Sequence, residues 1–135
     1  MTDHLTQEKR SWNMSQIRSK NTKPEIIVRS LLHNLGFRFR LHNKILPGKP
    51  DIVMKKFQII IFCHGCFWHQ HKNCSRATFP KSNVIYWKKK LKRNVQRFNE
   101  VKTELNNLKW RVHVIWECET KDLDLLSLKL LKIIN

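Results

Sequence analysis

Three cysteines and three histidines fall within twelve residues of this sequence, between Cys63 and Cys74. Thiolate and imidazole groups are the ligands that zinc binds in tetrahedral protein sites. One possible zinc site consists of Cys66, His71, Cys74 and Cys118. The loop would supply the first three ligands, and a distant segment would supply Cys118. Cys63 and Cys66 also form a CxxC pair. A site of four thiolates, with Cys63 in place of His71, is therefore the competing interpretation.

A second candidate site involves Asp51, which follows a Pro-Gly-Lys-Pro turn and begins a predicted strand. The next predicted strand ends at residues 62–64, so two adjacent strands would bring Asp51 close to that backbone and to His64. Carboxylate and main-chain carbonyl oxygens are hard ligands that suit Mg²⁺. His64 or His69 could transfer protons near neutral pH. Taken alone, the same pattern also fits an aspartate that only forms a turn.

Aromatic and basic residues cluster around the cysteine- and histidine-rich loop. Phe67 and Trp68 lie inside the loop, and Trp87 begins a predicted helix, where it also fits the apolar stripe. Aromatic side chains beside a basic surface can stack on bases or wedge between them. Residues 81–97 hold seven lysines and arginines and no acid. The candidate DNA contacts among them are Lys88, Lys89, Lys92 and Arg93.

Composition supports a nucleic-acid partner. The chain has 135 residues with 27 Lys and Arg against 10 Asp and Glu, a formal net charge of +17, and such a field favours a polyanion. No apolar run reaches the length of a membrane span, and no apolar signal core follows the first residues. We therefore expect a cytoplasmic protein without a membrane partner. In that compartment four cysteines favour metal binding over disulfides.

The elements that must position these residues follow from periodicity and capping signals. Strands and helices in this order predict an α/β fold, with a central mixed β-sheet flanked by helices. We expect residues 1–21 to form a flexible basic arm and residues 22–135 a single domain. The predicted elements are helices at 22–35, 83–108 and 123–134, and strands at 37–42, 51–54, 57–63 and 110–116, with a loop at 64–80.

Three short strings resemble the very short patch repair (Vsr) DNA mismatch endonucleases. They are PGKPD at 47–51, FCHGCFWHQH at 62–71 and IWEC at 115–118, and the resemblance runs from about Arg10 to Glu119. It implies a restriction-endonuclease-like fold with a structural zinc loop. It also implies Mg²⁺-dependent nicking of double-stranded DNA, 5′ to the thymine of a T:G mismatch. Such mismatches arise when 5-methylcytosine deaminates, which implies association with a cytosine-5 DNA methyltransferase. A monomer suits the cutting of one strand.

The resemblance assigns catalytic roles to five residues. Asp51 and the Cys63 main-chain carbonyl would bind Mg²⁺. His69 would activate the attacking water, and His64 would assist at the phosphate. Glu25 would reach the site from the first helix, a role that competes with a capping interaction at Thr22-x-x-Glu25.

The resemblance also assigns structural and DNA-contacting residues. For zinc it favours His71 over Cys63, together with the three other cysteines. Phe67, Trp68 and Trp87 would wedge into the DNA duplex from the major groove. Met14 would do so from the minor groove.

Three departures from the expected pattern keep two alternatives open. Cys63 stands where a small or hydroxyl residue is expected, and two residues instead of one separate His71 from Cys74. Phe98 stands where an acid is expected. One alternative is a restriction-type endonuclease without mismatch preference. The other is a catalytically inactive, zinc-stabilised DNA-binding protein.

Overall fold

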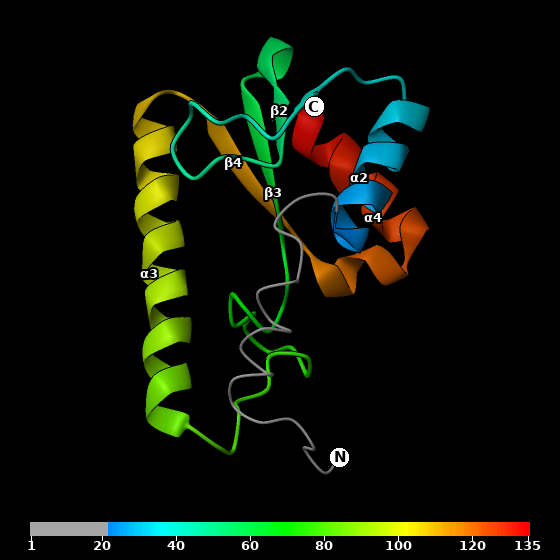
Figure 1. Cartoon of the computed structure of the whole chain (residues 1–135). Helices are drawn as coiled ribbons and strands as arrows, with labels where there is room; N and C mark the ends of the chain where they lie inside the picture. Colours follow the sequence, from blue (N-terminus) through cyan, green and yellow to red (C-terminus); the bar gives the residue numbers. More distant parts are fainter. Residues whose placement is uncertain (1–21) are drawn as a thin grey trace.

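The computed structural model describes residues 22–135, so the predicted arm at 1–21 and Met14 lie outside the described residues. Four strands form one sheet in the order β1-β2-β3-β4 (Figure 1). β2 is antiparallel to both β1 and β3, and β4 runs parallel to β3. Their bounds are Arg40–Leu41, Ile52–Met54, Ile59–His64 and Arg111–Trp116.

Within residues 22–135, three α-helices cover the two faces of this sheet. Helices α2 (Lys23–Asn34) and α4 (Leu123–Ile134) lie on one face, and the long helix α3 (Val84–Asn107) lies on the other (Figure 1). Two short 3₁₀ helices, η1 (Lys55–Phe57) and η2 (Glu117–Lys121), follow β2 and β4. The predicted α/β class and the order of its elements are confirmed. Within residues 22–135, no helix has the length and apolarity needed to span a membrane.

Successive side chains of β3 point to opposite faces of the sheet and so enter two different hydrophobic cores. Ile59 and Ile61 pack into the core shared with α2 and α4, whereas Ile60 and Phe62 pack into the core beneath α3. A strand that is covered on both faces has to be apolar along its whole length, which explains the continuous apolar run in the sequence. The same alternation carries on to the end of the strand, where Cys63 packs against the α2 side.

Helix α2 begins as the sequence predicts. The Thr22 hydroxyl accepts a hydrogen bond from the backbone N–H of Glu25 at 3.4 Å, and this satisfies one of the free donors of the first turn. Gly36 follows the helix with a φ of +87°, a conformation that glycine adopts without a steric penalty. The cap fixes where Glu25 enters the interior, and its side chain is only 1% exposed.

The strand predicted over residues 37–42 is much shorter in the structure. Only Arg40 and Leu41 pair with β2, because β2 itself is three residues long and β1 lies at the edge of the sheet. Phe37 and Phe39 still pack against the core as partly buried residues. The alternation therefore correctly indicated which side chains turn towards the core, but most of this extended segment is not hydrogen-bonded to another strand.

The turn that precedes Asp51 is held closely against α3, and this gives a first prediction. Gly48 has a φ of +74°, and a Cβ at this position would lie 2.4 Å from Val101 Cγ1. We expect Gly48→Ala to lower the free energy of unfolding by about 2–4 kcal/mol, since it combines backbone strain with overpacking. Urea denaturation measures this loss.

Gly36→Ala is the matched control for this prediction. Gly36 also has a positive φ, but nothing lies within 4 Å of a Cβ there, so the variant should show only the strain, about 1–2 kcal/mol. Adding Val101→Ala to Gly48→Ala should recover part of the lost stability. Equal losses in the two alanine variants would contradict the proposed clash.

Candidate active site and metal centre

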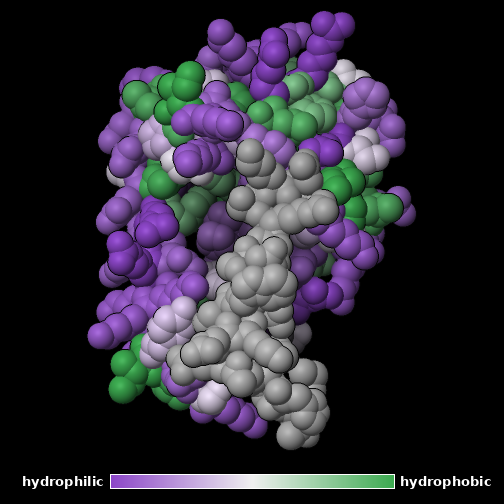
Figure 2. All heavy atoms as spheres, in the orientation of Figure 1, coloured by the Kyte–Doolittle hydropathy of each residue, from purple (hydrophilic) through white to green (hydrophobic). Residues whose placement is uncertain are grey.

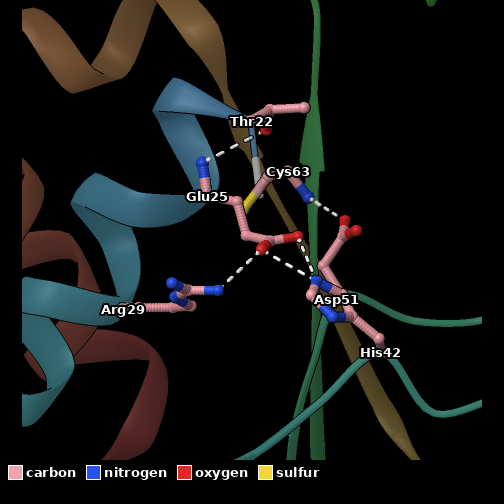
Figure 3. A network of polar contacts seen from close by, with 6 residues as sticks. All are labelled: Thr22, Glu25, Arg29, His42, Asp51 and Cys63. Carbon is pink, nitrogen blue, oxygen red and sulfur yellow. Dashed lines mark hydrogen bonds and ion pairs between the residues drawn. The ribbon is translucent and has the colours of Figure 1, made fainter. Parts of the chain in front are cut away.

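Asp51, Cys63 and Glu25 meet where β2, the end of β3 and helix α2 come together (Figure 3). Asp51 Oδ2 accepts a hydrogen bond from the Cys63 backbone N–H at 2.8 Å. Burial, with a smaller contribution from the neighbouring Glu25 carboxylate, raises the pKa of Asp51 to about 7 against the opposing effect of the Cys63 N–H. Two acidic side chains therefore share a space that disfavours the ionised form of one of them.

Glu25 is held by two side chains that the sequence analysis did not single out. Its two oxygens lie 3.0 and 2.9 Å from His42 Nε2, and Oε2 lies 3.2 Å from an Arg29 guanidinium nitrogen. His42 also donates its backbone N–H to the Asp51 carbonyl at 3.0 Å. The sequence carried a signal for the contact of His42 with Asp51 alone, because antiparallel pairing of the strands on either side of the turn at 46–50 places residue 42 opposite residue 51.

His64 and His69 form a stacked pair beside these acids. Their ring centroids are 3.6 Å apart with an interplanar angle of 7°. Burial lowers the pKa of His64 to about 3, with a further contribution from His69, and burial lowers the pKa of His69 to about 4. Within the described part of the chain, the Nδ1 atoms of both rings are buried without a hydrogen-bond partner. Both imidazoles are therefore neutral at pH 7.

Aromatic rings enclose this histidine pair. Phe98, from α3, meets His64 edge-on at a centroid distance of 4.4 Å and Phe62 at 5.3 Å, and Trp116 meets His64 at 5.2 Å. The position where an acid was expected thus supplies an apolar wall beside the imidazoles. Trp116 also stacks on His71 at 4.0 Å, a contact that no local sequence pattern indicated.

A group of four ligand atoms lies beyond the end of β3. The atoms lie within 4.8 Å of one another and belong to Cys66, His71, Cys74 and Cys118. The Cys118 Sγ atom is 3.5 Å from His71 Nδ1, close to the separation of about 3.5–4 Å expected between ligands of one tetrahedral zinc ion. Cys63 is not a member of this group. The cluster therefore has the composition that could hold a metal such as zinc.

The thiols of this cluster differ in their readiness to ionise. Backbone N–H groups, first that of Arg76, lower the pKa of Cys74, whereas burial raises the pKa of Cys66 to about 12. Metal binding deprotonates coordinating thiols and releases protons. Cys63 differs from the cluster, since burial, Asp51 and Glu25 all raise its pKa. Its thiol is protonated and packs against the apolar core.

An aromatic cluster lies between the loop and the beginning of α3. Phe67, Trp68 and Trp87 have ring centroids 5.3–5.9 Å apart. Trp87 is 5% exposed, whereas the two loop residues are half-buried. Lys90 places its ammonium group 5.4 Å from the centre of the Trp68 ring, a cation–π contact. Only Phe67 and Trp68 are thus positioned to meet a ligand directly, with Trp87 supporting them.

The basic residues of α3 do not all face the same way. Lys88, Lys89, Lys92 and Arg93 are exposed, and hydrophilic residues cover most of the α3 side in Figure 2. At about 100° per residue, Lys88 lies on the opposite side of the helix from Arg97, which lines the groove beside the active site. Lys90 and Arg93 lie nearer to the side of Arg97. Of the four predicted DNA contacts, Arg93 is therefore better placed than Lys88.

One groove of about 1210 Å³ connects these features. Its lining includes the acid and the histidine pair, Asp51, His64 and His69, as well as the loop aromatics. Basic side chains on its walls are Lys23, Lys44, Lys49 and Arg97. A groove with cations on its walls and an acid–imidazole centre is suited to a negatively charged substrate such as a phosphodiester.

Comparison with known proteins gives one family and several relatives. A family model described as DNA mismatch endonuclease Vsr matches residues 2–76. A protein named type II nicking enzyme V.XorIIP, from Xanthomonas oryzae pv. oryzae, is 48% identical over 135 residues, which cover 100% of this chain and 98% of the relative.

Two further relatives match over most of the chain. The type II nicking enzyme V.NmeAIP of Neisseria meningitidis serogroup A is 46% identical over 122 residues, 90% of this chain and 86% of the relative. The DNA mismatch endonuclease Vsr of Escherichia coli is 38% identical over 118 residues, 87% of this chain and 75% of the relative.

Proposed function

The chain belongs to the DNA mismatch endonuclease Vsr family, and from this membership we propose that it nicks one DNA strand 5′ to the thymine of a T:G mismatch. Membership makes it a DNA endonuclease, and therefore a hydrolase, of the mismatch-repair type. The name nicking enzyme, given to two of the relatives, supports cleavage of a single strand. The observation that carries the proposal is the meeting of Asp51 and Glu25 beside a groove that holds the neutral His64–His69 pair.

We assign the catalytic Mg²⁺ to Asp51 and the main-chain carbonyl of Cys63, with Glu25 beside them. Mg²⁺ binds hard oxygen atoms and uses one or two carboxylates at such sites. The donor set fits, because a pKa of about 7 for Asp51 reflects crowded negative charge in a partly dry site. A divalent cation would relieve that crowding. When bound, Mg²⁺ supplies Lewis-acid stabilisation of the charge that develops on the phosphate and the leaving oxygen.

We assign proton transfer to the histidine pair. His69 would take the proton from the attacking water, and His64 would assist at the phosphate. A general base has to be unprotonated before it acts, and burial lowers the pKa values of both rings far enough to ensure this. The negative charge of a DNA phosphate in the groove would in turn stabilise an imidazolium once it forms.

We assign a structural zinc ion to the ligand cluster formed by Cys66, His71, Cys74 and Cys118. Between residues 65 and 83 the chain forms no helix or strand, so this loop lacks the regular backbone hydrogen bonds that stabilise those elements. Cys118 follows β4, and its bond to a shared ion would fasten the loop to the sheet. Fastening the loop also fixes Phe67, Trp68 and His69, which lie between the first two ligands.

The half-buried aromatic residues of the loop are our candidates for mismatch recognition. Phe67 and Trp68 would wedge between base steps from the major groove, supported by Trp87, and Met14 would act from the minor groove. A T:G wobble pair stays largely helical, so direct contacts discriminate it poorly. A weakly stacked step is cheaper to open, and this difference would supply selectivity. The mismatch would arise by deamination of 5-methylcytosine, which makes a cytosine-5 methyltransferase the functional companion of a monomeric enzyme.

A nicking assay tests this function directly. End-labelled duplexes that differ only in T:G against C:G, in several flanking contexts, are incubated with Mg²⁺ or with EDTA. We expect a Mg²⁺-dependent nick immediately 5′ of the mismatched thymine and no cut in the C:G duplex.

The two alternatives predict different outcomes of the same assay. Equal cleavage of both duplexes would indicate a restriction-type endonuclease without mismatch preference. Retained mismatch binding without any cleavage, by protein that is folded and loaded with zinc, would indicate a DNA-binding role and direct attention to Cys63 and Phe98.

A further inference from the structure

We propose that His42 is a positioning residue, which fixes the Glu25 carboxylate beside Asp51 so that the two acids receive one divalent cation. The inference rests on the proposed Mg²⁺ site and adds to it a residue of the groove wall that acts through the Glu25 carboxylate.

The first argument is the geometry of the His42 imidazole. Nε2 lies 3.0 Å from one Glu25 oxygen and 2.9 Å from the other. A carboxylate can only accept hydrogen bonds, so Nε2 has to carry a hydrogen, which it shares between the two oxygens. A donor centred on both oxygens fixes the rotation of the carboxylate group. In Figure 3 the Glu25 carboxylate lies between this ring and the Arg29 guanidinium.

The second argument is the place of His42 in the chain. The residue follows β1 and donates its backbone N–H to the Asp51 carbonyl at 3.0 Å. The same residue therefore contacts one acid through its main chain and the other through its side chain. This double contact sets the spacing between Asp51 and Glu25, which come from different elements of the fold.

The third argument is the backbone conformation. His42 has a φ of +49°, a left-handed conformation that residues other than glycine rarely adopt and that costs about 1 kcal/mol or more. The conformation lets the ring turn back towards α2 at the end of an edge strand. Strain of this kind persists where the surrounding contacts support it, and His42 contacts the Asp51 main-chain carbonyl and the Glu25 carboxylate.

The fourth argument is burial. Glu25 is 1% exposed, and a carboxylate removed from water has to be paired to remain ionised and in place. Arg29 lies one turn along the same helix and supports one oxygen. His42 comes from the opposite side and contacts both oxygens, so its removal should loosen the orientation of Glu25 even when Arg29 remains.

The test uses full-length, zinc-loaded protein and Mn²⁺ as the probe. Mn²⁺ prefers oxygen ligands, and its binding is read from the electron paramagnetic resonance signal of the free ion, without DNA or turnover. We expect His42→Ala to weaken Mn²⁺ binding by about tenfold or more, as the loss of a residue that orients a metal ligand usually does. His42→Gln retains an N–H donor and should recover most of the affinity.

The control is His33→Ala, which removes an exposed histidine near the end of α2 and should leave Mn²⁺ binding unchanged. Circular dichroism establishes that each variant is folded. In nicking assays His42→Ala should raise the Mg²⁺ concentration for half-maximal rate more than it lowers the maximal rate. A variant that has merely lost stability would not show this split.

Two results would overturn the proposal. One is a wild-type affinity for Mn²⁺ in His42→Ala, and the other is an affinity in His42→Gln as low as that of the alanine variant. Neither result depends on what DNA the wild-type enzyme cuts. If the wild-type protein binds Mn²⁺ but cuts no T:G duplex, the proposed function fails while the role of His42 is still decided by the binding data.

Discussion

Asp51→Asn is expected to abolish strand cleavage and to stabilise the folded protein in the absence of divalent cations. The metal stabilises charge in the transition state by several kcal/mol, and each 1.36 kcal/mol changes the rate tenfold. We therefore expect a loss of about a thousandfold or more in the nicking rate on a T:G duplex. Binding of the same duplex, measured by fluorescence anisotropy, should be largely retained.

The gain in stability follows from the pKa of Asp51. Burial raises it from 3.8 to about 7 in the folded protein, so the folded state binds this proton more tightly than the unfolded state does. The corresponding stability is fully present below pH 3.8 and is lost as the pH rises through about 7. Above pH 7 the ionised carboxylate costs the cation-free protein up to about 4 kcal/mol.

Asparagine removes this cost, because it has no charge and its Oδ1 can still accept the Cys63 N–H. Urea denaturation without divalent cations should show a gain in the free energy of unfolding that grows between about pH 4 and pH 7 and stays nearly constant above pH 7. Asp124→Asn, which changes an exposed acid in the first turn of α4, is the matched control and should change activity little. Undiminished cleavage by Asp51→Asn would exclude the proposed mechanism.

The sequence predicted the parts of the fold whose signals are local. Helix α3 and the terminal helix α4 were found nearly to the residue, since apolar residues recur at helical spacing along both. Strand β3 was found because burial on both faces requires a continuous apolar run. Strand β1 was overestimated, because alternation reports which residues are buried and cannot report how far a partner strand extends.

For the candidate site, too, the residues with local sequence signals were predicted and those that depend on distant contacts were not. Short strings contained Asp51, His64, His69 and three of the clustered ligands, so their proximity could be predicted. His42 and Trp116 were missed, because their contacts with Glu25 and His71 join segments that are distant along the chain. Pairing of residues across a fold depends on register and on which face a side chain occupies, and neither quantity is written in a local pattern.

Trp87 shows a related limit. Its position fitted both a helix stripe and a DNA wedge, and the sequence alone gave these interpretations similar weight. The structure buries it beneath Phe67 and Trp68, so a direct contact with DNA would require this cluster to open. The exposure of the Trp87 side chain decides between core packing and direct DNA contact, and that exposure depends on how the loop at 64–80 packs against α3.

Cys118→Ser is expected to remove the metal from the ligand cluster and to inactivate the enzyme without touching the groove acids. The change takes away the ligand that joins the loop to the end of β4. The loop between residues 65 and 83 has short-range backbone hydrogen bonds, and its polar links to the rest of the chain include a 3.5 Å hydrogen bond from Asn94 to the Trp68 carbonyl and an exposed Arg76–Glu117 ion pair. We therefore expect metal binding to contribute much of its order. A loss of several kcal/mol corresponds to a fall in Tm of about 10 °C or more.

Three measurements check this expectation. Elemental analysis should show that zinc falls from one ion per chain to a small fraction of that value. Limited proteolysis should cut the variant within residues 65–83, and nicking should be lost, since His69 and the wedging aromatics lie in this loop. Removal of zinc from the wild-type protein by a chelator should reproduce all three effects, and added zinc should reverse them only in the wild type.

Cys63→Ser is the matched control, and it separates the two ligand sets that the sequence left open. The Cys63 thiol packs against the apolar core beside α2 and is not part of the ligand cluster. Serine at this position should therefore keep one zinc ion per chain and an ordered loop, whereas His71→Ala should lose both. If Cys63→Ser lost its zinc and His71→Ala kept it, the four-thiolate site would be correct, and β3 would have to end differently from the arrangement seen here.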